Sequence, residues 1–198
     1  MRGKIIVIEG TDCSGKETQT SLLVQRLKRE GKKVERLRFP MYETPTGKIV
    51  GGPYLGKDYI TPCWFSEGAV NVDPKVAAFY YAADRRYNLT TIENYLRDGS
   101  DLIIDRYVES NMAHQGCKIA DKEERLKLYK WLETLEYNLL ELPKPDLTIL
   151  LHMPYKKVVE LKRGRIGTDE HESSLSYLKT SEEAYLELAS MNNHQIIK

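Results

Sequence analysis

The chain has 198 residues, of which 41% are hydrophobic and 30% are charged; this composition predicts one soluble globular domain and excludes a disordered chain. Its 30 lysine and arginine residues nearly balance its 29 aspartate and glutamate residues, and the net charge of +1 argues against a nucleic-acid-binding protein. Three widely spaced cysteines indicate free thiols in a reducing compartment, and the sequence predicts neither a signal peptide nor a membrane span. The expected location is therefore the cytoplasm.

The predicted elements alternate between strands and helices along the chain. Strands are predicted at residues 4–8, 33–39, 101–105, 146–153 and from 195 onward. The stretch 33–39 alternates apolar with charged residues, whereas runs such as 4–8 are continuously apolar, as in a buried strand. Helices are predicted between them, at about 16–30, 73–96, 122–142, 154–161 and 172–191, with a loop or short helix at 109–116. The clearest start is Asp73-Pro74, where a capping carboxylate precedes a proline at the first helical position. The alternation predicts an α/β fold with a five-stranded parallel sheet flanked by helices and with ligands at the carboxyl ends of the strands.

Residues 41–72 form the least regular part of the chain because proline and glycine recur throughout them. A short helix is expected to begin at Thr44 or Pro45. The rest, about 53–72, is expected to be an irregular insertion. A loop of this length inside a compact domain is either functional or mobile, or it is a surface insertion without a role.

A glycine-rich stretch, Gly-Thr-Asp-Cys-Ser-Gly-Lys, connects the first predicted strand to the first predicted helix. In this context two glycines allow the backbone to curl around an anion, and the N–H groups and the helix dipole then face that anion. The lysine adds a full positive charge for the β- and γ-phosphates. The stretch therefore predicts a phosphate loop that binds ATP through Gly10, Thr11, Asp12, Cys13, Ser14, Gly15, Lys16, Glu17 and Thr18.

One position in this loop departs from the usual motif. The residue after Lys16 is normally serine or threonine, whose hydroxyl binds Mg²⁺, but here it is Glu17. A carboxylate is also a hard oxygen ligand, so Glu17 is predicted to bind Mg²⁺ together with Asp105. The alternative is that Glu17 points away and pairs with a neighbouring lysine or arginine, which leaves the ion to Thr18 or to water.

Two further sets of residues are suited to phosphate chemistry. Asp105-Arg106 follows the third strand, where a carboxylate can hold Mg²⁺ and an arginine can bind a phosphate through two N–H groups. Lys162, Arg163 and Arg165 are clustered in a segment between two helices, about 162–171, that is predicted to be a lid over the phosphates. The alternatives are an incidental ion pair at a strand end and a solvated basic loop.

Taken in this order and at these spacings, the motifs resemble those of the thymidylate kinases over nearly the whole chain. The matching stretches are the phosphate loop with its internal Asp12, Arg38-Phe39-Pro40, Tyr81-Ala82-Ala83-Asp84-Arg85, Asp105-Arg106-Tyr107, Ser110 with Gln115-Gly116, and the lid with Asp169 and Glu172. The resemblance implies a single three-layer P-loop NTPase domain over 1–198 and ATP-dependent phosphorylation of dTMP to dTDP. It also implies ATP and dTMP as partners, Mg²⁺ as cofactor and a homodimer.

The resemblance also implies roles for individual residues. Asp12 would approach the 3′-hydroxyl of the acceptor, Arg85 would donate to O4 of thymine, and Tyr107 would crowd the 2′ position of the sugar. The implied dTMP-binding set is Asp12, Arg38, Phe39, Tyr81, Arg85, Arg106, Tyr107, Ser110 and Gln115, with Tyr81 stacked on the base and Ser110 and Gln115 at its edge. The implied catalytic set is Lys16, Asp12, Arg106, Arg163 and Arg165.

Several positions depart from the family pattern. Tyr42 stands where the family often has an arginine, so binding of the acceptor phosphate is expected to fall on Arg38 and Arg106. Cys13 stands where some members have a catalytic arginine, and His114 stands where an aromatic residue often precedes the Gln-Gly pair. The family also usually continues into a final helix, which this chain lacks, so either the chain is cut or its donor pocket is incomplete.

Two other functions remain open at this stage. One is a kinase of the same fold that acts on another acceptor, such as dUMP, a deoxynucleoside or a short-chain metabolite. The other is a protein that binds nucleotides without transferring a phosphoryl group, for which the main support is Glu17 and the short C-terminus.

Overall fold

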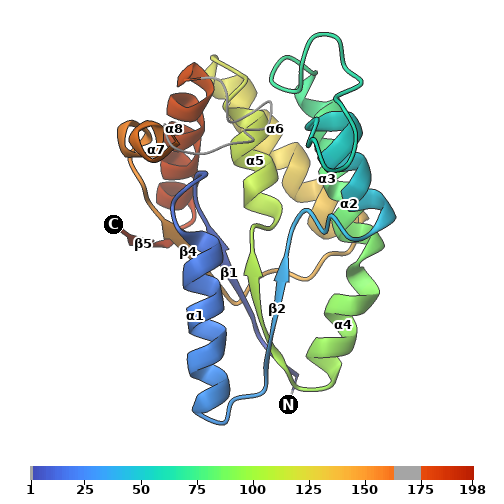
Figure 1. Cartoon of the computed structure of the whole chain (residues 1–198), viewed down its shortest axis with the longest axis vertical. Helices are drawn as coiled ribbons and strands as arrows, with labels where there is room; N and C mark the ends of the chain where they lie inside the picture. Colours follow the sequence, from blue (N-terminus) through green and yellow to red (C-terminus); the bar gives the residue numbers. More distant parts are fainter. Residues whose placement is uncertain (1, 163–174) are drawn as a thin grey trace.

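The computed structural model describes residues 2–162 and 175–198. Its centre is a five-stranded parallel sheet with the strand order β2-β3-β1-β4-β5 (Figure 1). The strands are β1 (Ile5–Glu9), β2 (Val34–Arg38), β3 (Asp101–Asp105), β4 (Leu147–Leu151) and β5 (Gln195–Ile197). The expected α/β fold with five parallel strands is therefore confirmed.

The helices agree with the expected order but differ in where two of them end. They are α1 (Lys16–Arg29), α2 (Pro45–Ile49), α3 (Pro74–Tyr87), α4 (Leu89–Arg97), α5 (Val108–Gly116), α6 (Lys122–Glu133), α7 (Tyr155–Lys162) and α8 (Leu175–Met191), with π-helical turns η1 (Val50–Tyr54) and η2 (Thr134–Leu139). The predicted start at Asp73-Pro74 is confirmed, since the Asp73 carboxylate accepts hydrogen bonds from the N–H groups of Lys75 and Val76.

The predicted single helix over 73–96 is wrong, because Asn88 divides it into α3 and α4. The side-chain amide of Asn88 donates to the backbone oxygen of Asp84 at 2.8 Å, in competition with the regular helical hydrogen bonds. The predicted helix over 122–142 likewise changes character, since α6 continues into the π-helical turn η2 from Thr134. This turn carries Glu136, which lies in the candidate active site described below.

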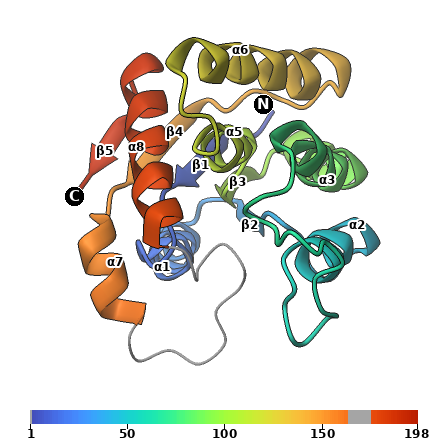
Figure 2. The same ribbon diagram turned by 90° about the horizontal axis from the view of Figure 1, so that it is seen from above.

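The sheet is covered on both faces, which gives three layers. Alternate strand residues such as Val7 and Ile104 pack with α4, α5, α6 and α8, whereas Ile8 and Ile103 pack with α1 through Val24. Viewed from above, α1 lies on one side of the strands and α5 and α6 lie on the other (Figure 2). In the described ranges, no helix has both the length and the apolar composition needed to cross a membrane.

The irregular insertion has a small hydrophobic core of its own. Tyr54, Leu55, Ala69 and Val72 are buried there and pack with Val50 of η1 and Ala77 of α3. The Lys118 ammonium group, which follows α5, donates to the Tyr54 hydroxyl and to the backbone oxygens of Ala69 and Val72 at 3.0–3.2 Å. The insertion is therefore packed against the domain beside the carboxyl ends of the strands.

Candidate active site

The phosphate loop occupies the turn between β1 and α1, and its backbone is strongly curved. Gly10, Cys13 and Gly15 have φ angles of 149°, 58° and 84°, in the region that glycine favours. A Cβ atom on Gly10 would lie 2.5 Å from the backbone oxygen of Leu151, so no larger residue fits there. The close approach of β4 therefore explains the first glycine of the motif.

The Lys16 side chain folds back over this loop. Its ammonium group donates to the backbone oxygen of Thr11 at 2.6 Å and contacts the Ser14 hydroxyl at 3.4 Å. Burial, together with the nearby charge of Arg106, lowers the pKa of Lys16 to about 8. A bound anion would offset both effects, so a phosphate group at the loop would stabilise the charged form of Lys16.

Two adjoining pockets lie at the carboxyl ends of the strands. The first, here called the loop pocket, has a volume of about 330 Å³, and the second, the inner pocket, has about 60 Å³. Among the predicted site residues, the loop pocket is lined by Asp12, Cys13, Gly15, Lys16, Glu17, Thr18, Arg38, Phe39, Asp105 and Arg106. The inner pocket is lined by Asp12, Phe39, Tyr81, Arg85, Arg106 and Ser110. The remaining loop residues are Gly10, Thr11 and Ser14.

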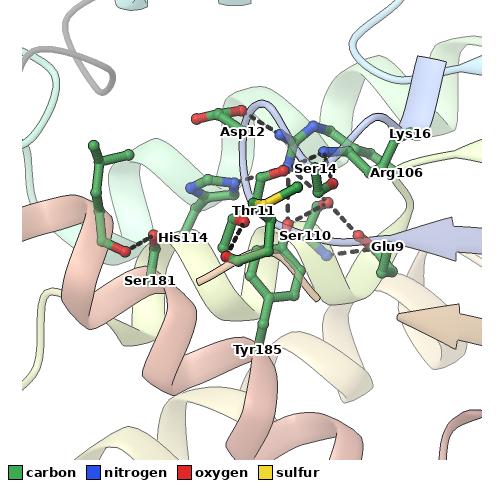
Figure 3. Close-up of polar contacts among 12 residues, drawn as sticks. Glu9, Thr11, Asp12, Ser14, Lys16, Arg106, Ser110, His114, Ser181 and Tyr185 are labelled. Atoms are coloured by element: carbon green, nitrogen blue, oxygen red, sulfur yellow. Dashed lines mark hydrogen bonds and ion pairs between the residues drawn. The ribbon is translucent and has the colours of Figure 1, made fainter. Parts of the chain in front are cut away.

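Arg106 lines both pockets. Figure 3 shows its side chain among Asp12, Ser110, His114 and Tyr185. Its Nη2 forms an ion pair with the Asp12 carboxylate. Its Nη1 donates to the Tyr185 hydroxyl at 2.9 Å and lies 3.0 Å from Nε2 of His114 and 3.4 Å from the Ser110 hydroxyl. Contacts from both terminal nitrogens, Nη1 and Nη2, therefore fix the orientation of the guanidinium.

The contact with Arg106 also determines the protonation of His114. An arginine can only donate, so Nε2 of His114 accepts and the ring proton is on Nδ1. Nδ1 lies 2.8 Å from the Tyr177 hydroxyl of α8, whose oxygen accepts a hydrogen bond from the Nδ1–H group. His114 and Tyr177 thus link the pocket wall to the helix that follows the predicted lid.

A buried carboxylate, Glu9, connects the end of β1 to the start of α5. It accepts hydrogen bonds from the N–H groups of Tyr107 and Ser110 at 2.8 and 3.0 Å, and from the Ser110 hydroxyl at 2.5 Å. Burial raises the pKa of Glu9. Its contacts at the N-terminus of α5 favour the charged form and hold the backbone of Tyr107 and Ser110 in place. Sequence reasoning did not identify this residue.

Arg85 is almost fully buried at the base of the inner pocket. Its Nε and Nη2 bind the two carboxylate oxygens of Glu136, the second at 2.7 Å. Glu136 also accepts from the amide nitrogen of Asn111 at 2.8 Å. Within the described residues, the Oδ1 acceptor of Asn111 is buried and has no hydrogen-bond partner. The pocket therefore contains one positioned arginine and one unsatisfied acceptor.

Two residues predicted to contact the substrate are absent from the lining of both pockets. Tyr107 has its ring in the core, and its hydroxyl donates to the backbone oxygen of Pro143 at 3.1 Å. Gln115 is fully buried and also lines neither pocket. Asn111 and His114 line the inner pocket instead.

Helical periodicity groups the residues that line the pocket but does not exclude Gln115. With about 100° per residue, Ser110, Asn111 and His114 lie within one face of α5. Gln115 stands four residues after Asn111 and therefore close to the same face, so its burial follows from tertiary packing and not from a pattern in the sequence.

The two predicted metal ligands differ in their surroundings. Asp105 is 8% exposed and lines the loop pocket, and its Oδ1 is a buried acceptor without a partner in the described part of the chain. A hard oxygen in that position fits Mg²⁺. The Glu17 side chain is 71% exposed, and its Oε1 lies 3.5 Å from Arg38 and 4.0 Å from Arg36. This geometry favours the alternative in which Glu17 pairs with arginine.

The predicted lid residues Arg163, Arg165, Asp169 and Glu172 lie outside the described residues. Across 2–162 and 175–198, no group of three or more histidine, cysteine, aspartate or glutamate residues forms a metal-binding cluster. Asp105 is therefore the described residue whose geometry best fits the expected metal ion.

The fold and the paired pockets define a P-loop phosphotransferase. Comparison with known proteins identifies the family: the family model described as thymidylate kinase matches residues 8–198. The chain belongs to the thymidylate kinase family, which confirms the family and enzyme class expected from the sequence.

Relatives and a solved structure extend this similarity over the whole chain. The chain is 34% identical to a probable thymidylate kinase from Pyrobaculum aerophilum, with 97% of this chain and 86% of the relative covered. It is 31% identical to the thymidylate kinase of Homo sapiens, with 100% and 78% covered. A structure of thymidylate kinase from Candida albicans matches with a TM-score of 0.76 and 26% identity, with 99% and 83% covered.

Proposed function

We propose that the chain transfers the γ-phosphoryl group of ATP to dTMP and releases dTDP and ADP. The observation that carries this proposal is the junction of the two pockets, where Asp12 and Arg106 line both. A donor bound at the phosphate loop and an acceptor bound in the inner pocket would meet there. Membership of the thymidylate kinase family supports the same pair of substrates.

The donor phosphates are held by the loop backbone and by Lys16. Successive N–H groups, the N-terminus of α1 and the ammonium group together place positive charge around the β- and γ-phosphates. Because the transition state of phosphoryl transfer spreads negative charge over oxygens, catalysis rests on positioning and on such charges. In the proposed mechanism, Arg163 and Arg165 of the predicted lid add further positive charge to the transferring group.

The inner pocket is complementary to the edge of thymine. Nη1 of Arg85 is the guanidinium nitrogen that Glu136 does not use, and it supplies a donor for O4. Oδ1 of Asn111 supplies an acceptor for the N3–H group. Cytosine presents a donor at position 4 and an acceptor at N3, so both contacts would be mismatched. Tyr81, which lines the same pocket, provides the surface on which the ring stacks.

The sugar and phosphate of the acceptor lie at the pocket junction. Arg106 and Arg38 bind the acceptor phosphate, and Asp12 accepts a hydrogen bond from the 3′-hydroxyl. Because Asp12 also pairs with Arg106, one ion pair orients both groups. Misplacement of the attacking oxygen is thereby limited, which matters because rate depends steeply on geometry.

The proposal includes Mg²⁺ held by Asp105, with the hydroxyl of Thr18 as a second oxygen near the loop pocket. The ion would supply charge neutralisation between the β- and γ-phosphates. Asp105 also faces Arg36, whose Nη2 lies 3.8 Å from Oδ2 and holds the carboxylate in place.

We also propose a homodimer located in the cytoplasm. The side chains of Val76, Phe79 and Tyr87 on α3 are exposed, and Phe79 packs edge-on against Trp131 of α6. An exposed apolar surface of this kind is a candidate interface. Among the described residues, Cys13, Cys63 and Cys117 form no disulfide, which agrees with the reducing compartment proposed here.

A panel of acceptors tests the proposed function. The chain is incubated with ATP and Mg²⁺, and release of ADP is coupled to a spectroscopic assay with dTMP, dUMP, dCMP or thymidine as acceptor. We expect dTMP to give the highest kcat/KM, with dCMP at least 100-fold lower because two polar contacts are mismatched. A higher kcat/KM for any other member of the panel would contradict the proposal.

A further inference from the structure

A fourth cation lines the loop pocket, and it comes from a different part of the fold. Lys16, Arg38 and Arg106 belong to the phosphate loop and the ends of β2 and β3, whereas Lys57 belongs to the irregular insertion. The sequence motifs did not point to Lys57. Its presence in the lining gives the insertion a direct part in the pocket.

The backbone around Lys57 is fixed by the end of the π-helical turn. The N–H of Gly56 donates to the oxygen of Gly52 at 2.7 Å, and the N–H of Lys57 donates to the oxygen of Gly51 at 2.8 Å. Gly56 has φ of 66°, and an added Cβ would meet the Cys63 nitrogen at 3.0 Å. These hydrogen bonds and the turn at Gly56 fix the backbone from which the Lys57 side chain extends.

Lys57 lies close to the point where the two pockets meet. Its Nζ is 5.3 Å from the centre of the Tyr42 ring, and the guanidinium of Arg38 is 5.5 Å from the same ring. Tyr42 lines both pockets, as Arg106 does. An acceptor with its base in the inner pocket would bring its phosphate to this junction. The Tyr42 ring thus lies close to two of the cations that line the loop pocket.

Two carboxylates that line the loop pocket lie against two of its arginines. Asp12 forms an ion pair with Arg106, and Glu17 lies 3.5 Å from Arg38. Each arginine therefore shares its charge with an anionic side chain. Lys57 is a further cation among the residues that line this pocket, and its four-carbon stem lets the ammonium group reach an oxygen of the phosphate.

We propose that Lys57 binds the phosphate group of the acceptor nucleotide, together with Arg38 and Arg106. This assignment rests on the proposed function and makes the insertion a functional part of the acceptor site. It compensates for Tyr42, which brings no charge of its own to that position. Because the contact is to the phosphate, it contributes to the binding of a monophosphate and not to that of a nucleoside.

Isothermal titration calorimetry with dTMP and with thymidine tests this assignment. The variants are Lys57→Met and Lys57→Gln, which remove the charge, and Lys57→Arg, which keeps it; Lys48→Met removes an exposed charge outside both pockets. We expect Lys57→Met and Lys57→Gln to weaken dTMP binding about tenfold and to leave thymidine binding within about twofold. Lys57→Arg should stay within about threefold for dTMP, and Lys48→Met should match the wild-type chain.

The assignment is overturned if the neutral variants bind dTMP as the wild-type chain does, or if thymidine binding falls by the same factor. Equal melting temperatures of the unliganded proteins show that the variants are folded. If the wild-type chain does not bind dTMP, the proposed function fails and this assignment fails with it. If the wild-type chain binds dTMP and the neutral variants bind it equally well, only the role of Lys57 is refuted.

Discussion

Arg85 and Glu136 form a two-point ion pair inside the protein, although 51 residues separate them in the sequence. Their side chains are 2% and 0% exposed. Glu136 also binds the amide of Asn111, so one carboxylate orients both residues that present polar atoms to the base. The π-helical turn η2 places Glu136 at this point, and the base-binding surface depends on that turn.

The first prediction concerns this ion pair. We expect Glu136→Gln to lower the free energy of unfolding by about 3–5 kcal/mol, because a buried arginine is left without its counter-charge. Urea denaturation at pH 7 measures the change. Glu133→Gln, at a partly exposed position one turn earlier, is the matched control and should cost less than about 1 kcal/mol. A loss for Glu136→Gln no larger than for the control would show that the pair is not required for stability.

The second prediction concerns base selection. Asn111→Ala removes the acceptor proposed for the N3–H group, so we expect the ratio of kcat/KM for dTMP over dCMP to fall about tenfold. A ratio is independent of how much of the variant is folded, which separates recognition from stability. An unchanged ratio would remove Asn111 from the base-binding surface.

Gln115→Leu is the companion variant. Gln115 is buried, lines neither pocket, and its two amide atoms have no hydrogen-bond partner in the described part of the chain. Replacing an unsatisfied amide by an apolar group of similar size should keep or raise the free energy of unfolding. The dTMP to dCMP ratio should not change, and a fall as large as that of Asn111→Ala would restore Gln115 as a base contact.

Some parts of the site could be predicted from the sequence, and others could not. The phosphate loop and the strands are encoded by neighbouring residues, so their positions follow from local patterns. Arg85 and Glu136 meet only through tertiary packing, and no spacing in the sequence relates them. Tyr107 follows the Asp105-Arg106 pair directly, yet its side chain enters the core, because the turn into α5 rotates it away from the pocket.

The third prediction separates the two candidate metal ligands. Asp105→Asn should raise the Mg²⁺ concentration that gives half-maximal activity by about tenfold, because a hard, charged oxygen is lost from the loop pocket. Glu17→Ser should change that concentration by less than about threefold, since Glu17 lies against Arg38. Mg²⁺ titration of the kinase activity at fixed ATP provides the measurement. A larger shift for Glu17→Ser than for Asp105→Asn would reverse the assignment.

The fourth prediction follows from the buried ammonium of Lys118, which binds the insertion. Burial lowers the pKa of Lys118 to about 8, whereas the unfolded chain keeps the ordinary value near 10.5. Between these two values the unfolded state holds a proton that the folded state has lost, so this group makes stability rise with pH over about 8 to 10.5. Below pH 8 both states are charged, and the folded state bears the cost of burial.

Lys118→Met removes this dependence. We expect the free energy of unfolding of the wild-type chain, relative to the variant, to increase by up to about 1 kcal/mol per pH unit between pH 8 and 10. Urea denaturation of both proteins at pH 7.5, 8.5 and 9.5 provides the comparison, and Lys48→Met serves as an exposed control. Parallel pH curves for Lys118→Met and the wild-type chain would contradict the burial of a charged amine at this position.

The central claim is that the phosphate loop and the inner pocket serve one reaction, and transfer of label from [γ-³²P]ATP to dTMP tests it most directly. Nucleotides are separated by chromatography after incubation with the wild-type chain or with Lys16→Met. We expect labelled dTDP from the wild-type chain and a rate at least about 100-fold lower from the variant, because a charge on the transferring group is lost. The account is contradicted if the wild-type chain forms no labelled dTDP, or if Lys16→Met forms it at the same rate.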